Sequence, residues 1–193
     1  EDAFLLARGP LDFAGIEGAP VVLEPAGDVW RGVMVLDAGA PSTWRYTTVA
    51  KTDVITLPGW TLTGGITFYQ SPIALDHVRI LGTRAEDGFN TIRTTFRFED
   101  SEFAGTASDA FDADFCEGLV ARTSFHDIAA DGIDVSGSIV EVRAVRMYAI
   151  GDKGLSVGEA SQLTAQDISL EQVTYGIVSK DRSHVTAERV AVT

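Results

Sequence analysis

Three aspartates in two short segments could do chemistry together. Asp112 and Asp114 lie in DADFC (112–116), and Asp134 lies in DGIDVSGS (131–138). Side chains at i and i+2 of an extended chain point the same way, so Asp112 and Asp114 are expected to share a face. If the two segments stack, the three carboxyl groups form one patch, here called the aspartate patch. It could be an acid pair for glycoside chemistry, a Ca²⁺ site or a solvated column of side chains.

Charge repulsion within the aspartate patch has to be relieved in some way. Stacked strands lie about 4.8 Å apart, and two unit charges at about 4.8 Å repel by roughly 3–4 kcal/mol at an effective dielectric of about 20. A raised pKa, a bound cation or a neighbouring base would each relieve this repulsion. Arg93, Lys153 and Lys180 lie near enough in the sequence pattern to supply positive charge.

A second series of aspartates and a group of mixed charges flank the patch. Asp87, Asp109 and Asp131 recur at one place in successive repeats, where each carboxylate is expected to bond its own downstream backbone. The segments GDKGLSVGEAS (151–161) and VSKDRS (178–183) add charges that form either an outer ladder of ion pairs, each contributing under about 1 kcal/mol, or a substrate-binding surface. The substrate-binding candidates are Arg93, Lys153, Glu159, Lys180 and Asp181.

An internal repeat must position these residues. A small residue followed by a large apolar one recurs along the chain, and from Gly65 onward the steps are 23, 22, 22, 22 and 22 residues. Each pair is followed by alternation with period 2, which is typical of short strands, and no repeat shows helical spacing. The pattern predicts an all-β fold, a right-handed parallel β-helix of about seven coils with about 22 residues per coil. The large residues are expected in one interior column: Val33, Ile66, Phe89, Phe111, Ile133, Leu155 and Ile177.

The same repeat indicates the domain organisation. We expect residues 1–193 to form a single β-helix domain, and because the sequence ends in mid-pattern we expect it to be a piece of a longer chain. The first step, from Gly32 to Gly65, is 33 residues, so an inserted loop is expected within 36–63. The segment GAPSTWRYTTVAKTD (39–53) is its natural place. The three tryptophans are expected in the core or over this excursion, or as a platform for sugar rings.

Composition and charge exclude several kinds of partner. The formal net charge is −13, so neither nucleic acid nor an acidic membrane surface is expected to bind. The sequence has no run of about 18 apolar residues, so no membrane span is expected. Cys116 is the single cysteine, which allows no internal disulfide, and it is expected to be a small buried apolar side chain.

The repeat segments resemble a known bacterial module. The segments WRGVMVLDAG, LTGGITFYQS, AEDGFNTIR, SDAFDADF, DGIDVSGS, GDKGLSVGEAS and GIVSKDRS follow one another along the chain. Their order resembles that of a right-handed parallel β-helix found in proteins that also carry a CotH-type kinase-like domain. The resemblance spans roughly residues 30–182 and extends, more broadly, to the pectate-lyase-like superfamily. It implies export and other domains of a parent chain as partners, and it carries over no catalytic residues.

Catalytic members of that superfamily match less well. Polygalacturonase-like enzymes carry Gly-His-Gly and Arg-Ile-Lys motifs, which this sequence lacks, and Arg93 is the nearest candidate for the arginine base of calcium-dependent pectate lyases. We therefore expect a non-catalytic extracellular or cell-surface module that binds a polysaccharide or a partner beside another domain. One alternative is a polysaccharide lyase or glycoside hydrolase that uses the aspartate patch, with Ca²⁺ as the cofactor to consider. The other is a structural spacer. His126, beside Asp127, is a further candidate base.

Overall fold

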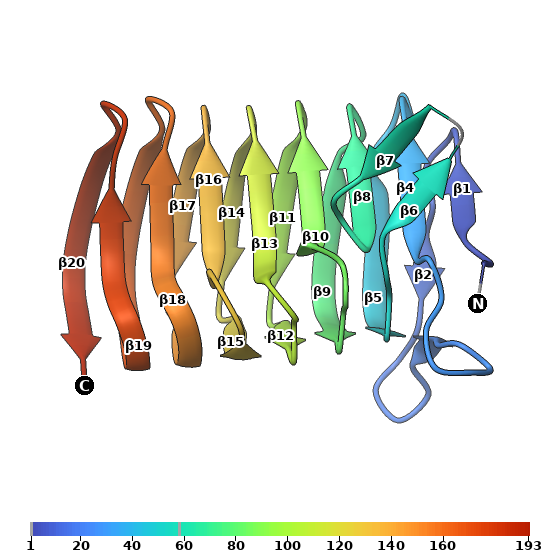
Figure 1. Ribbon diagram of the computed structural model, residues 1–193, viewed down its shortest axis with the longest axis horizontal. Helices are drawn as coiled ribbons and strands as arrows, with labels where there is room; N and C mark the ends of the chain where they lie inside the picture. Colours follow the sequence, from blue (N-terminus) through green and yellow to red (C-terminus); the bar gives the residue numbers. More distant parts are fainter. Residues whose placement is uncertain (1, 58) are drawn as a thin grey trace.

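The chain folds into a stack of parallel strands (Figure 1). The computed structural model describes residues 2–57 and 59–193, and all regular structure in these ranges is β. Successive coils pair in parallel and form a β-solenoid of about eight turns. The predicted all-β parallel β-helix with about 22 residues per coil is thereby confirmed. In the ranges given above, the chain has no helix of the length and apolar character needed to cross a membrane.

Each coil has three sides, and each side is a ladder of parallel strands. The first side contains β1 (Leu5–Ala7), β4 (Val33–Leu36), β8 (Ile66–Tyr69), β10 (Asp87–Ile92), β13 (Asp109–Asp114), β16 (Ile133–Ser136) and the ends of β18 (Arg146–Gly158) and β19 (Gln162–Ser179). The second side contains β2 (Phe13–Ala14), the starts of β5 (Ser42–Ala50) and β9 (Ile73–Leu81), β11 (Thr95–Glu99), β14 (Glu117–Ala121), β17 (Ile139–Arg143), and the starts of β19 (Gln162–Ser179) and β20 (His184–Val192). The third side contains β3 (Val21–Leu23), the ends of β5 and β9, β12 (Glu102–Ala104), β15 (Ser124–Ile128), the start of β18, the middle of β19 and the end of β20.

The chain turns between sides at residues with a left-handed backbone. Where the first side meets the second, φ is 53° at Arg93, 55° at Phe115 and 55° at Glu159. Where the second side meets the third, φ is 57° at His77 and 49° at Arg122. Residues with a Cβ adopt positive φ uncommonly, yet these five positions carry one, and Gly137 takes the corresponding place in the first corner with a φ of 60°. Backbone hydrogen bonds to the neighbouring coils hold them in this conformation.

Apolar columns fill the interior. Strand register places the seven predicted residues in one column, from Val33 to Ile177, and all but Ile177 are fully buried. Aromatic rings fill the neighbouring columns, where the rings of Phe103 and Phe125 stack with their centroids 4.8 Å apart. Trp44 is also fully buried, which agrees with the core assignment for this tryptophan.

The extra residues of the long first step lie later than expected. The assignment of 39–53 as an excursion is wrong, because Ser42–Ala50 form strand β5 and pair with β9 along its length. The pattern misled because the small-large pairs mark only the first side, so the 33-residue step from Gly32 to Gly65 does not show where the extra residues lie. An antiparallel hairpin of β6 (Ile55–Leu57) and β7 (Trp60–Leu62) follows instead. In Figure 1 this hairpin lies across the first side in front of β4 and β8.

Candidate functional site

The aspartate patch forms on the first side, where the two acidic segments stack as predicted. Asp112 of β13 pairs in register with Asn90 of β10 and with Asp134 of β16. Asp114 pairs with Ile92 and with Ser136 in the same two strands. The structure therefore places the three sequence-predicted acids on two adjacent coils, where Asp112, Asp114 and Asp134 are all half-buried.

Asn90 joins two of these carboxyl groups. Its Nδ2 donates to Asp112 Oδ2 at 3.1 Å and to Asp114 Oδ2 at 3.4 Å. Asn90 is only 1% exposed, because the chain that follows the hairpin passes over it. A Cβ at Gly64 would lie 3.0 Å from Asn90 Cβ, so this crossing requires glycine. The sequence offers no reason to select Asn90, because its position in the repeat is that of an ordinary outward-facing residue.

Burial raises the pKa of all three carboxyl groups in the patch. Burial, with the neighbouring carboxyls of Asp114 and Asp87 next in importance, raises the pKa of Asp112 to about 9. Burial also raises the pKa of Asp114 and that of Asp134. Of the three expected ways to relieve the repulsion, a raised pKa is the one with direct support at Asp112. A neutral carboxyl of this kind can donate a proton at neutral pH.

The second series of aspartates bonds between coils. Asp109 Oδ1 accepts the backbone N–H of Asp131 at 2.8 Å, and Asp131 Oδ1 accepts that of Lys153 at 3.0 Å. Each carboxyl thus bonds the equivalent residue one coil later, so the expected bond to its own downstream backbone is wrong for these two. Burial raises the pKa of Asp109 to about 6 and that of Asp87 to about 7.

The aspartates of the first side are poorly suited to bind a divalent cation. Within the described part of the chain, one carboxylate oxygen from each of Asp109, Asp131 and Asp134 lies within 4.8 Å of the others. Asp112 and Asp114, which were expected as ligands, are outside this group. Lys153 Nζ lies 3.2 Å from Asp131 Oδ1 and also pairs with Asp152. Its ammonium group already supplies positive charge to Asp131, one of the three possible ligands.

The predicted substrate-binding residues separate into two places. Lys153 belongs to the first side, whereas Arg93, Glu159 and Asp181 follow one another up the first corner, with Lys180 just before Asp181. The guanidinium carbon of Arg93 lies 4.8 Å from the centre of the Phe115 ring. No carboxylate of the described residues forms an ion pair with Arg93. Its donors therefore remain available at the surface.

The second side carries an extended depression that sequence reasoning missed. Four adjoining hollows share lining residues and follow the stack of coils, and together we call them the axial trough. The largest has a volume of about 510 Å³ and contains Arg93 and Phe115 at its rim. A Cβ at Gly118 would lie 2.6 Å from the Phe96 ring, so the packing beneath the trough requires glycine. Its lining includes Thr95, Arg97, Glu117, Ile139, Glu141 and Gln162.

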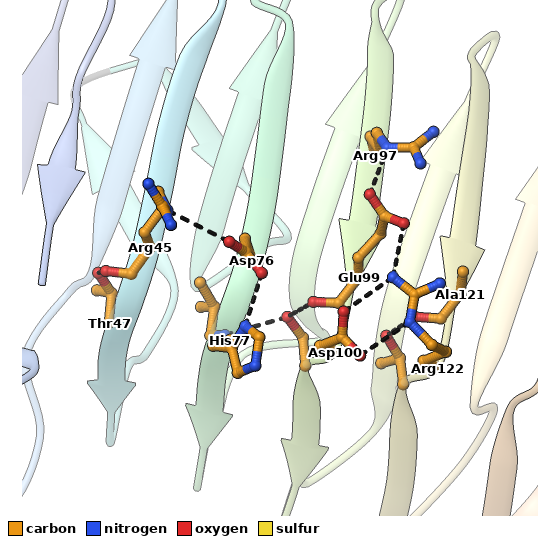
Figure 2. A network of polar contacts seen from close by, with 12 residues as sticks. Arg45, Thr47, Asp76, His77, Arg97, Glu99, Asp100, Ala121 and Arg122 are labelled. Atoms are coloured by element: carbon orange, nitrogen blue, oxygen red, sulfur yellow. Dashed lines mark hydrogen bonds and ion pairs between the residues drawn. The ribbon is translucent and has the colours of Figure 1, made fainter. Parts of the chain in front are cut away.

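Charged side chains beside the trough are tied to one another. Figure 2 shows Glu99 between Arg97 and Arg122, with Asp100 also bound to Arg122. Arg122 makes hydrogen bonds of 2.9 and 2.8 Å to the two carboxylate oxygens of Asp100. In the same view, His77 Nδ1 lies 2.6 Å from Asp76 Oδ1. These pairs stiffen the second corner.

The histidine considered as a base is fully engaged. His126 Nδ1 lies 2.8 Å from Asp127 Oδ2, and Nε2 lies 3.0 Å from Glu102 Oε1. Its ring also stacks on Tyr148, with the centroids 4.7 Å apart. Because both ring nitrogens face carboxylates, His126 is suited to a charged structural role and has no nitrogen left to accept a proton from a substrate.

Comparisons with known proteins find distant likenesses. No family model and no curated protein matches the chain. A crystal structure of a mutant of the periplasmic alginate epimerase AlgG is similar over 100% of this chain and 71% of its own, with a TM-score of 0.45 and 11% identity. A proposed glycosyl hydrolase from Parabacteroides merdae is similar over 84% of this chain and 81% of its own, with a TM-score of 0.35 and 8% identity. Likeness at this level carries no conclusion about the chemistry of this chain.

Proposed function

We propose that this chain is a non-catalytic β-helix module that binds a polysaccharide along the axial trough. It acts outside the cell or at its surface, beside another domain of a longer protein. The observation that carries the proposal is the trough itself, which follows the second side across successive coils. A polymer can occupy such a depression over several of its units, so many weak contacts add together.

The chemistry of the trough supports a sugar ligand. Its largest hollow, about 510 Å³ in volume, is open to solvent along the second side, so a ligand can enter it without any rearrangement of the coils. Phe115 is 51% exposed and Ile139 is 56% exposed, so both offer apolar surface to the C–H faces of a sugar ring. Thr95 and Gln162 supply polar groups that can bond sugar hydroxyls, and the guanidinium of Arg93 adds further donors.

The proposal is tested by comparing two exposed positions on different sides. Ile139→Asp places a charge in the trough, and Tyr175→Ala removes a side chain of β19 that is 56% exposed on the first side. Titration calorimetry against a panel of polysaccharides should show binding by the wild type and by Tyr175→Ala. Binding by Ile139→Asp should be weaker by about tenfold or more, which corresponds to about 1.4 kcal/mol. Equal affinities of all three proteins would contradict the proposal.

A second candidate function rests on the acids of the first side. The pKa of Asp112 is raised to about 9 and that of Asp109 to about 6, so one carboxyl is protonated and another largely ionised at neutral pH. Carboxyls with separated pKa values can act as general acid and general base. Analysis of the polysaccharides for cleavage products after incubation with the protein distinguishes catalysis from binding alone. Sugar products formed by the wild type and lost in Asp112→Asn would establish a lyase or hydrolase in place of a binding module.

A further inference from the structure

We infer that the polysaccharide suited to the axial trough is an unbranched, uncharged chain that lies parallel to the solenoid axis. The inference rests on the proposed function and specifies the class of ligand. Three features of the trough carry it: the balance of its charges, the pairing of those charges and the regular spacing of its lining residues.

The lining of the trough is electrically balanced. The whole chain has a formal charge of −13, but the trough contributes none of that excess. Its charged side chains are two arginines and two glutamates: Arg93, Arg97, Glu117 and Glu141. A polyanion approaching this surface meets a strongly negative protein without any compensating basic surface in the trough, so electrostatic attraction does not favour it.

Ion pairs further reduce the charge that a ligand would meet. Arg97 pairs with Glu99, and Glu141 pairs with Arg143. The remaining two charges, on Arg93 and Glu117, have opposite signs and line the same hollow. An anionic sugar would be attracted by the arginine but repelled by the glutamate in the same hollow. Sugar hydroxyls, in contrast, can accept from Arg93 and donate to Glu117 without either penalty.

The lining residues repeat at the spacing of the coils. Thr95 pairs in register with Glu117, Glu117 with Ile139, and Ile139 with Gln162. Neighbouring strands lie about 4.8 Å apart, which is comparable to the length of one pyranose unit in an extended chain. An unbranched polymer can therefore present one unit to each coil. Branches would project into the sides of the trough and break this correspondence.

The experiment measures affinity against both chain length and charge. The wild type is titrated with linear neutral gluco-, xylo- and manno-oligosaccharides, from disaccharide to hexasaccharide, and with oligomers of galacturonate and mannuronate of the same lengths. At least one neutral series should bind, with affinity rising as units are added until the trough is filled. Each acidic series should bind about tenfold or more weakly than that neutral series.

A charge reversal provides the matched control. Glu117→Lys gives the trough a net positive charge, so the ratio of the affinity for acidic oligomers to that for neutral oligomers should rise by about tenfold or more. Tighter binding of an acidic series by the wild type, abolished by Ile139→Asp, would overturn this inference and leave the proposed function standing. An affinity for neutral chains that is independent of their length would also overturn it. Absence of binding to every series would refute both.

Discussion

Replacing Asp112 with Asn should make the protein more stable at neutral pH. Asn keeps the shape of the side chain, and its carbonyl oxygen can still accept from Asn90 Nδ2, which lies 3.1 Å from Asp112 Oδ2. The variant removes only the carboxyl whose pKa burial and repulsion raise from 3.8 to about 9. In the wild type this group stays protonated in the folded state while the unfolded chain ionises it.

The direction of the effect follows from proton linkage. Because the folded state holds the proton more tightly, the contribution of Asp112 to stability is full below its unfolded pKa and is lost as the pH rises toward the folded value of about 9. Over most of that window the folded state binds about one more proton at this site, so the free energy of unfolding falls by about 1.4 kcal/mol per pH unit. From about pH 5 to about pH 7 the loss is therefore about 3 kcal/mol.

Neighbouring groups do not reverse this trend. Asp87 and Asp109, with pKa values raised to about 7 and about 6, add slope of the same sign and remain in the variant. Arginine partners lower the pKa of Glu99 and of Glu102, so their stabilising effect is lost only as the pH falls through those lowered values. The difference between wild type and Asp112→Asn isolates the slope due to Asp112.

Thermal melts followed by circular dichroism from about pH 4.5 to pH 8 measure this difference. The variant should melt higher than the wild type, and this difference should grow by about 6–12 °C between about pH 5 and about pH 7, at about 2–4 °C per kcal/mol for a chain of this size. Asp37→Asn is the matched control, because Asp37 is exposed and its φ of 48° suits Asn. Parallel curves for wild type and Asp112→Asn would refute the assignment of a buried, protonated Asp112.

Two further results are expected. Phe111→Ala should lower the free energy of unfolding by about 3–5 kcal/mol, because Phe111 is fully buried in the interior column; urea unfolding measures this, and a loss under about 1 kcal/mol would show that the column is not tightly packed. Addition of Ca²⁺ should leave the melting temperature nearly unchanged because Lys153 neutralises Asp131, whereas a large rise that disappears in Asp134→Asn would show that the acidic face binds the metal.

Register and interior packing could be predicted from sequence because both depend on a strict period. A 22-residue step fixes which residue lies above which, so the stacking of Asp112 on Asp134 followed directly from counting. The long first step could not be divided in the same way. Strand β5 carries the interior Trp44 and Val49, but it lies between two small-large pairs that are 33 residues apart, so counting alone could not tell its residues from those of the hairpin at β6 and β7.

The axial trough could not be predicted because it depends on side-chain volumes across coils. Gly118 is an interior position without a side chain, and the Phe96 ring from the preceding coil fills its place. The corners could not be predicted from the sequence either. Arg93 and Phe115 have φ values of 53° and 55°, and glycine is the residue that would have indicated such a backbone. Only the folded coils show that these two residues meet at the rim of a hollow.

Variants on the first and second sides distinguish between the candidate functions. A carboxyl that is protonated because it is buried destabilises the fold at neutral pH, so packing does not explain why an aspartate stands at position 112 in place of an asparagine. If Asp112→Asn proves more stable than wild type and binds polysaccharide equally well through the second side, the carboxyl serves neither stability nor binding. Product analysis of wild type and Asp112→Asn then decides between the two functions: sugar products lost in the variant would establish acid chemistry on the first side, and absence of products in both proteins would support the binding module. If the variant is less stable, the contacts of Asn90 with Asp112 and Asp114 stabilise the fold by more than the buried carboxyl costs.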